Sequence, residues 1–170
     1  MLDFAWLLGD DFIAAQLSTD KRQFDRTNSL AVIGVIASDH HGLVVEGHAR
    51  KMEGTFTEEL VEATTFIGRI KMAIKNGWDK VDIEGDSYVV VNRLLSFKPD
   101  LSFVGFHLRQ VRDLLQKRTK FKVLVVPQKA NRVAHELARW AVVSGSSTWF
   151  VSYVPCYISN LVVHEAVGID

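Results

Sequence analysis

Hydrophobic positions along the chain follow two different periods, and the change between them divides the sequence. Before residue 50, apolar residues form short runs at 12–18, 30–37 and 43–49, separated by polar stretches. Runs of this length bounded by turn residues are typical of β-strands. The turn at 39–42 ends in a glycine that is free to adopt a positive φ. The spacing of the three runs predicts an antiparallel meander.

The period changes to that of a helix after residue 55. Apolar residues then recur in steps of three and four, which places them on one helical stripe: Leu60, Ala63, Ile67, Ile70 and Ile74. Two residues are candidates for the N-cap, because Thr55 forms a capping box with Glu58 and Thr57 stands one residue before the helix. Gly77 is expected to end the helix.

A fourth strand is predicted at 80–84, and it leads into a sharp corner. The corner has the sequence Glu84-Gly85-Asp86-Ser87 and precedes an apolar run that we interpret as a second helix. Ligand sites in α/β proteins gather at the carboxyl ends of strands, so Asp86 is well placed for chemistry. Asp or Ser before an apolar run is also the pattern of a helix N-cap. Both interpretations of Asp86 remain open from the pattern alone.

The remaining elements complete an α/β pattern. An amphipathic helix is predicted up to residue 117, a fifth strand at 121–126, and a last core helix after Pro127. The order of elements favours an α/β domain with a five-stranded mixed sheet, in which strands 1–3 are antiparallel and helices flank the sheet. We expect this domain to span residues 1–143. Residues 144–170 are too aromatic for a disordered segment and are predicted to form a tail that packs on the domain or extends from it.

Composition places the chain among ordinary globular proteins. Of its 170 residues, 48% are apolar and 24% are charged, which suffices for one domain with a substantial core. The single cysteine, Cys156, excludes an internal disulfide and suits a reducing compartment. No basic residue marks the N-terminus as a secretory signal, and no apolar run approaches the roughly 18 residues that cross a bilayer. We expect an intracellular protein, nuclear or cytoplasmic, that is monomeric and has no membrane partner.

Charge is distributed unevenly although the net charge is zero. Residues 1–108 hold 11 Lys and Arg against 16 Asp and Glu, a net charge of −5, whereas residues 109–139 hold 9 against 2, a net charge of +7. A basic segment beside an acidic one can bind phosphates next to carboxylates that bind metal. A solvated helix face with basic flanks gives the same pattern. The charge permits a nucleic-acid partner but does not require one.

Five short motifs occur in a fixed order over about residues 10–143. They are Ser18-Thr19-Asp20, Ile33-Gly34-Val35-Ile36-Ala37-Ser38-Asp39-His40-His41-Gly42, Val61-Glu62-Ala63, Glu84-Gly85-Asp86-Ser87, and Val126-Pro127-Gln128-Lys129-Ala130-Asn131-Arg132-Val133-Ala134-His135-Glu136-Leu137-Ala138. In this order they resemble the ribonuclease H type 1 domain. The likeness is strongest to the plant ribonuclease-H-like domains that derive from retroelement reverse transcriptases.

The resemblance implies a metal-dependent endonuclease that cuts the RNA strand of RNA–DNA hybrids. Asp20, Glu62 and Asp86 would then hold two Mg²⁺ ions, with Mn²⁺ as an alternative, about 3.5–4 Å apart. One ion would activate the attacking water and the other would stabilise the leaving 3′ oxygen. Mg²⁺ prefers hard oxygen ligands. Carboxylates this close repel each other by about 4 kcal/mol per pair at 4 Å and an effective dielectric constant near 20, so a cation relieves strain.

Three features depart from the family pattern or from simple periodicity. His135 occupies the fourth acidic position of the active enzymes and completes the expected catalytic set; imidazole suits softer divalent ions than Mg²⁺. Lys21 replaces the glycine that usually follows the first aspartate. Glu62 lies with Phe66 and Arg69 off the core stripe of its helix, where the periodicity alone predicts a solvated charge.

Two functions from different classes follow from these observations. The first is an RNA–DNA hybrid endoribonuclease, which the three matched carboxylates favour. The second is a catalytically degenerate nucleic-acid-binding module that keeps the fold, which His135, Lys21 and the short link at 127–130 favour.

Overall fold

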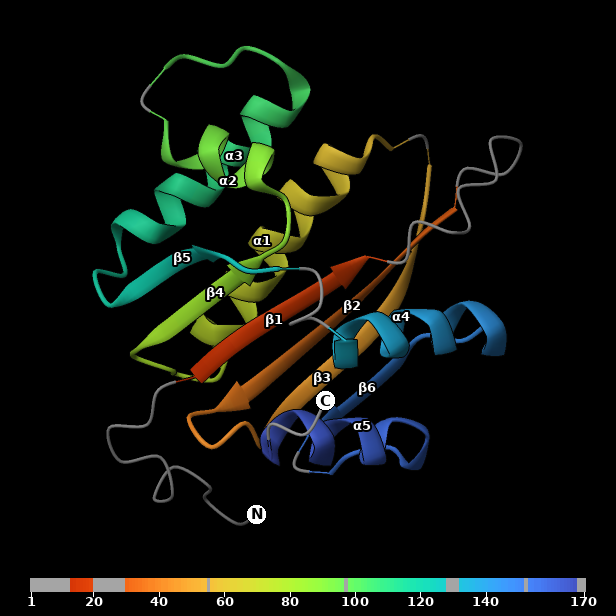
Figure 1. Ribbon diagram of the computed structural model, residues 1–170. Helices are drawn as coiled ribbons and strands as arrows, with labels where there is room; N and C mark the ends of the chain where they lie inside the picture. The colour runs from red at the N-terminus through yellow and green to blue at the C-terminus, as the bar shows by residue number, and fades with distance from the viewer. Residues whose placement is uncertain are drawn as a thin grey trace.

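The computed structural model describes residues 13–19, 30–54, 56–96, 98–127, 132–151 and 153–167. Helices cover both faces of a central sheet, so the molecule has three layers (Figure 1). The strands are β1 (Ile13–Thr19), β2 (Leu30–Asp39), β3 (Val44–Glu53), β4 (Val81–Gly85), β5 (Phe121–Val125) and β6 (Thr148–Val151). The helices are α1 (Glu58–Lys75), α2 (Tyr88–Leu95), α3 (Phe103–Gln116), α4 (Arg132–Ser144) and α5 (Cys156–Val167).

The described strands form one mixed sheet in the order β5-β4-β1-β2-β3-β6. The predicted meander is confirmed, since β1 pairs with β2 and β2 with β3 in antiparallel fashion. β4 inserts beside β1 and runs parallel to it, with Ala15 opposite Ile83, and β5 continues parallel to β4. Because β1 and β4 are parallel neighbours, their carboxyl ends lie at the same edge of the sheet.

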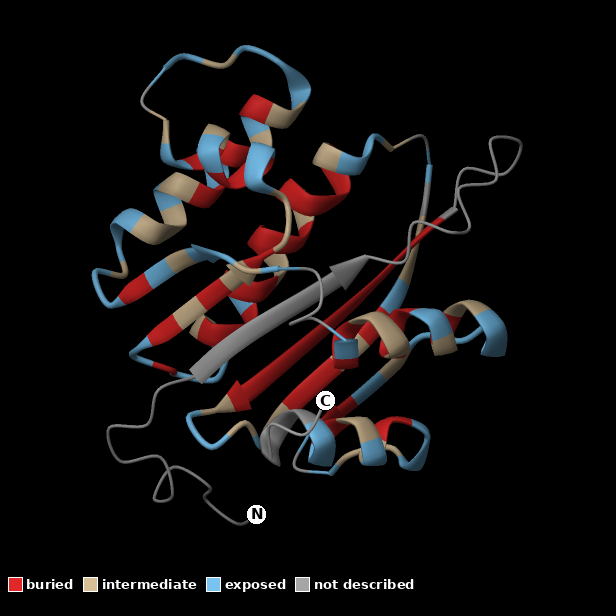
Figure 2. Ribbon diagram, in the orientation of Figure 1, coloured by how far each residue is buried: buried red, intermediate tan, exposed pale blue. Residues whose placement is uncertain are grey.

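β2 is buried on both faces, which explains its continuous apolar sequence. Val35 and Ala37 belong to the cluster beneath α1, α2 and α3, whereas Val32 and Ile36 belong to the cluster beneath α4 and α5. Figure 2 shows both clusters, as buried residues along the strands and on the sides of the helices that face the sheet. The α/β architecture expected from the sequence, a mixed sheet flanked by helices, is therefore present.

Thr57 is the N-cap of α1, so the second of the two candidate caps is the one used. Its side chain accepts a hydrogen bond from the backbone N–H of Leu60 at 3.2 Å. At the other end Gly77, with φ at +70°, follows the C-cap Asn76, as the sequence predicts. Both ends of the first helix are thus fixed by local side-chain chemistry.

The sheet has one more strand than the five that the sequence predicts. Residues 148–151, placed in the tail by the sequence, pair antiparallel with β3 and form its outer neighbour, β6. A strand of four residues is too short to show a period of two, which is why the pattern did not reveal it. Ile158 and Val162 of α5 share a buried cluster with α4. The domain boundary at residue 143 stays a prediction.

None of the helices in the described ranges combines the length and the apolar character that a membrane-crossing segment needs.

Candidate active site

The corner after β4 packs against Glu62 of α1. Gly85 is buried, and a Cβ atom there would lie 2.7 Å from Phe66 Cζ and 3.0 Å from Glu62 Oε1. Only glycine leaves room for these side chains of α1 against the end of the strand. The Glu62 carboxylate therefore lies against the residue that immediately precedes Asp86.

Ser87, rather than Asp86, caps the second helix. The Ser87 hydroxyl accepts a hydrogen bond from the backbone N–H of Val90 at 3.4 Å. Asp86 is half-buried and stands between the last residue of β4 and this cap. The interpretation of Asp86 as the N-cap is therefore wrong, and its carboxylate is not engaged in capping α2.

Of the other two expected site residues, Asp20 and His135, only His135 lies within the described residues. Asp20 lies outside the described residues, although β1 ends one residue before it. His135 is half-buried in the first turn of α4. The preceding residue, Ala134, packs so closely on Gly34 that a Cβ there would lie 2.2 Å from the Ala134 carbonyl oxygen, and Gly34 pairs with Ser18. His135 therefore lies on the α4 side of the sheet, close to the level of the end of β1.

A buried arginine accompanies Glu62, and sequence reasoning missed its role. Glu62 is 2% exposed, and Phe66 and Arg69 are fully buried, so the expectation of a solvated face is wrong. Arg69 Nη2 lies 3.8 Å from Glu62 Oε1, and Arg69 Nη1 donates a hydrogen bond to the Glu84 carbonyl oxygen. The guanidinium carbon is 4.7 Å from the centre of the Phe66 ring. The spacing of i, i+4 and i+7 was the available signal that these side chains share a face.

Opposing effects act on the charge of Arg69. Burial lowers the pKa of its guanidinium to about 10, while the negative charges of Glu62, Asp86 and Glu84 raise it. At neutral pH the side chain is therefore still a cation. A buried charge is costly unless partners compensate for it. Arg69 thus provides a fixed positive charge whose field reaches three carboxylates at the carboxyl end of β4.

The donor chemistry of this corner fits a hard divalent cation. Glu62 and Asp86 offer carboxylate oxygens, the ligands that Mg²⁺ and Mn²⁺ accept in proteins. Within the described ranges, no group of three or more His, Cys, Asp or Glu side chains is arranged to hold a metal ion. A complete site therefore needs a ligand from outside these ranges, where Asp20 lies. Arg69 is a competing cation on the protein side of Glu62.

Residues 21–141 match the model of a protein family described as reverse transcriptase-like. The match spans more than half of the chain. The chain belongs to the reverse transcriptase-like family. This result confirms the resemblance inferred from the five motifs. A search of curated proteins for relatives of this reverse transcriptase-like chain found no match.

Solved structures share the fold of this reverse transcriptase-like chain at low sequence identity. RNase H1 from the halophilic archaeon Halobacterium salinarum has a TM-score of 0.67 and 21% identity, covering 78% of this chain and 98% of its own. The N-terminal RNase H domain of a Mycobacterium tuberculosis protein has a TM-score of 0.62 and 18% identity, covering 79% and 99%. LC11-RNase H1, isolated from compost and solved with an RNA/DNA hybrid, has a TM-score of 0.63 and 16% identity, covering 79% and 98%.

Proposed function

We propose that this chain is a metal-dependent endoribonuclease that hydrolyses the RNA strand of RNA–DNA hybrids. The observation that carries the proposal is the buried Glu62 carboxylate packed against Gly85, directly beside Asp86, within a ribonuclease-H-like sheet. If Glu62 were exposed to solvent, a side chain at position 85 would not collide with its carboxylate. Support for the hybrid as substrate comes from similar folds, one of which was solved with an RNA/DNA hybrid bound.

In this mechanism the protein fixes oxygen ligands at one edge of the sheet. Glu62 and Asp86, together with Asp20, would hold the Mg²⁺ or Mn²⁺ ions. When bound, such ions act as Lewis acids that lower the pKa of a bound water and stabilise charge on the leaving oxygen. Glu62 lies against Gly85 and 3.8 Å from the guanidinium of Arg69. Asp86 is half-buried and keeps a surface toward solvent, which suits a ligand that also meets substrate.

A second function, a nucleic-acid-binding module without catalysis, is favoured by one specific observation. Arg69 lies 3.8 Å from Glu62 and already supplies positive charge where a metal ion would otherwise be attracted. His135 at the fourth acidic position reduces the negative charge of the cluster further. Both features weaken the attraction for a divalent cation, and neither disturbs the fold.

A cleavage assay separates the two functions. The folded protein is incubated with a labelled RNA–DNA hybrid in Mg²⁺ and, separately, in Mn²⁺. We expect RNA cleavage that is lost in Glu62→Gln and in Asp86→Asn and kept in the matched control Asp113→Asn, which removes an exposed carboxylate from α3. Absence of cleavage with both ions, in a sample that still binds the hybrid, would overturn the proposal in favour of the binding module.

A further inference from the structure

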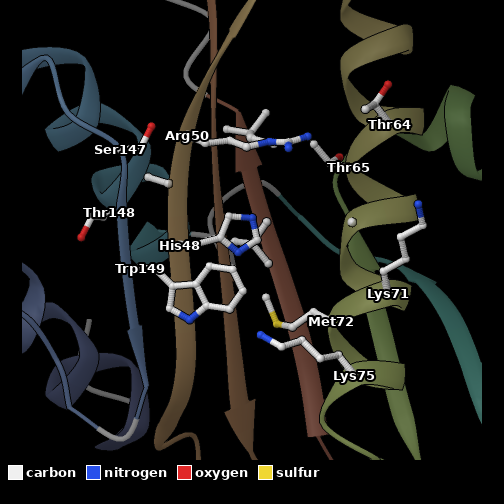
Figure 3. A pocket seen from close by; sticks show the side chains of 14 residues that line it. His48, Arg50, Thr64, Thr65, Lys71, Met72, Lys75, Ser147, Thr148 and Trp149 are labelled. Carbon is white, nitrogen blue, oxygen red and sulfur yellow. The ribbon is translucent and has the colours of Figure 1, made fainter.

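A groove of about 440 Å³ runs between α1 and the β3–β6 edge of the sheet. Figure 3 shows its walls, with side chains of α1 on one side and side chains of β3 and β6 on the other. Its apolar surface includes Ile33, Val35 and Met72. Thr65, whose hydroxyl donates a hydrogen bond to the Glu62 carbonyl oxygen at 2.7 Å, also lines it. The groove therefore lies on the flank of α1 away from the β4 corner.

Exposed cations from both walls surround the groove. Arg50 comes from β3, and Lys71 and Lys75 come from α1. In the described part of the chain, none of the three forms an ion pair within 4.0 Å. Glu46 is a nearby acidic group that is buried and accepts a hydrogen bond from Asn76. Burial raises its pKa, although the Asn76 hydrogen bond and the charge of Lys75 act in the opposite direction. The rim is therefore positive and open to a negatively charged ligand.

An aromatic pair projects into the groove from β3 and β6. The rings of His48 and Trp149 are stacked, with centroids 5.7 Å apart, and Lys75 Nζ lies 4.3 Å from the centre of the Trp149 ring. Trp149 is 52% exposed. Burial and the charge of Arg50 lower the pKa of His48 to about 4, so the imidazole is neutral at pH 7. Its Nδ1 is buried without a hydrogen-bond partner among the described residues, so the ring meets a ligand through its face and not through this atom.

Gly68 opens the α1 wall of the groove. It stands in the interior of the helix, where glycine costs about 1 kcal/mol relative to alanine. A Cβ at this position would meet no atom within 4 Å, so no packing contact in the described structure requires glycine there. The structural consequence of the missing side chain is free space beside Lys71 and Thr65.

We infer that this groove binds single-stranded nucleic acid, with phosphates on Arg50, Lys71 and Lys75 and a base against Trp149 and His48. Cationic grooves with exposed aromatic rings are the common means of binding single strands, because every base has a face that can stack. The inference rests on the proposed function, which supplies nucleic acid as the ligand.

The register of the sheet connects the groove to the candidate active site. Arg50 pairs with Ile33, which pairs with Thr19 at the end of β1, so Arg50 lies level with the edge where Asp20 follows. His48 and Trp149 lie further along the strands, away from that edge. A strand that leaves the active-site edge can therefore continue along α1 into the groove.

The charge contribution is tested by the salt dependence of binding to a fluorescent single-stranded DNA, measured by anisotropy in EDTA. We expect the triple variant Arg50→Gln/Lys71→Gln/Lys75→Gln to bind more weakly and to lose about 2 from the slope of log K against log salt, since each single-strand phosphate contact contributes about 0.7. The matched control is Lys80→Gln/Lys98→Glu, which lowers the net charge by the same three units at two exposed lysines that lie outside the groove and outside the basic segment 109–139. Equal losses in both variants would overturn the inference, because binding would then follow net charge alone.

A steric variant tests the groove without changing its charge. Gly68→Leu fills the open wall and replaces glycine with a good helix former, so folding should be preserved. We expect at least a fivefold loss of single-strand affinity with an unchanged or higher Tm, and a similar loss for Trp149→Ala. Unchanged affinity in Gly68→Leu would exclude the groove as the site. Equal competition by polyglutamate would contradict the role of bases.

Hybrid cleavage measured in parallel keeps the two proposals distinguishable. If the wild-type protein cuts no hybrid but Gly68→Leu loses single-strand binding, the nuclease proposal is wrong and single-strand binding by the groove is supported. If the hybrid is cut and the variant binds single strands normally, the groove is not the binding site and the nuclease proposal is supported.

Discussion

Arg69 places a permanent positive charge inside the protein, next to the carboxylate on which the candidate site depends. Its guanidinium is fully buried, lies 3.8 Å from Glu62, and donates to the Glu84 carbonyl oxygen at the end of β4. This charge compensates in part for burying the Glu62 carboxylate, and it also lowers the affinity of the candidate site for a divalent cation.

We predict that Arg69→Met destabilises the fold by about 3 kcal/mol, because it leaves the buried Glu62 without this cation. The measurement is the free energy of unfolding in urea, with Arg109→Met, an exposed arginine of α3, as a control that should change by less than about 0.5 kcal/mol. Adding Glu62→Gln to Arg69→Met should recover part of the loss. A more stable Arg69→Met protein would show that the pair does not hold Glu62 in place.

His48 gives the folded state a specific pH dependence. The pKa of its imidazole is about 4 in the folded protein and near 6.5 when unperturbed. Between these two pH values the imidazole is protonated in the unfolded chain and neutral in the folded chain. Stability should be independent of this group above pH 6.5 and should fall as the pH is lowered from 6.5 to 4. Urea unfolding of His48→Gln should show a smaller decline over this range than the wild type. Parallel curves would contradict a neutral, buried imidazole.

At the scale of elements, the contact between α1 and the β4 corner depends on Gly85. The helix could be predicted from its period, and its cap from Thr57, because both signals are local. The burial of Glu62 and Arg69 could not be predicted, because it depends on α1 packing against a strand end that is distant in sequence. Helical periodicity identifies only the apolar face of a helix. Charged residues off that face are predicted to be exposed, so a buried ion pair there is not predicted.

Two glycines of this region should respond to alanine in opposite ways. Gly85→Ala places a Cβ 2.7 Å from Phe66 and 3.0 Å from Glu62 Oε1, so we expect about 1–3 kcal/mol of destabilisation and loss of hybrid cleavage. Gly68→Ala meets open space and should stabilise α1 by up to about 1 kcal/mol. Both are measured by thermal unfolding. Equal effects would contradict the tight contact at the corner.

At the scale of the whole molecule, the order of the motifs predicted more than any single pattern. The parallel pairing of β4 with β1 brings the carboxyl ends of the two strands, at Thr19 and Gly85, to one edge of the sheet. The sequence order, through its likeness to a known domain, predicted this fold. It did not predict β6, because a strand of four residues that pairs with the edge of β3 is too short to show an alternating pattern in the sequence.

The two C-terminal elements, β6 and α5, are expected to contribute to the stability of the fold. Phe150, Ile158 and Val162 belong to the buried cluster beneath α4, and β6 covers the edge of β3. A protein truncated after Val143 would expose that apolar surface and an unpaired strand edge. We predict a lower Tm and concentration-dependent aggregation, measured by calorimetry and light scattering. An unchanged Tm would support a tail that is independent of residues 1–143.

The nuclease proposal requires that the fold gathers Asp20, Glu62 and Asp86 into one cation-binding cluster. Anomalous diffraction from crystals grown with Mn²⁺ locates the metal independently of any assay. We expect a manganese peak within coordination distance, about 2.0–2.3 Å, of carboxylate oxygens of Glu62 and Asp86. A structure without metal at that edge at high Mn²⁺ concentration, or with the Asp20 side chain directed to the other face of the sheet, would contradict it.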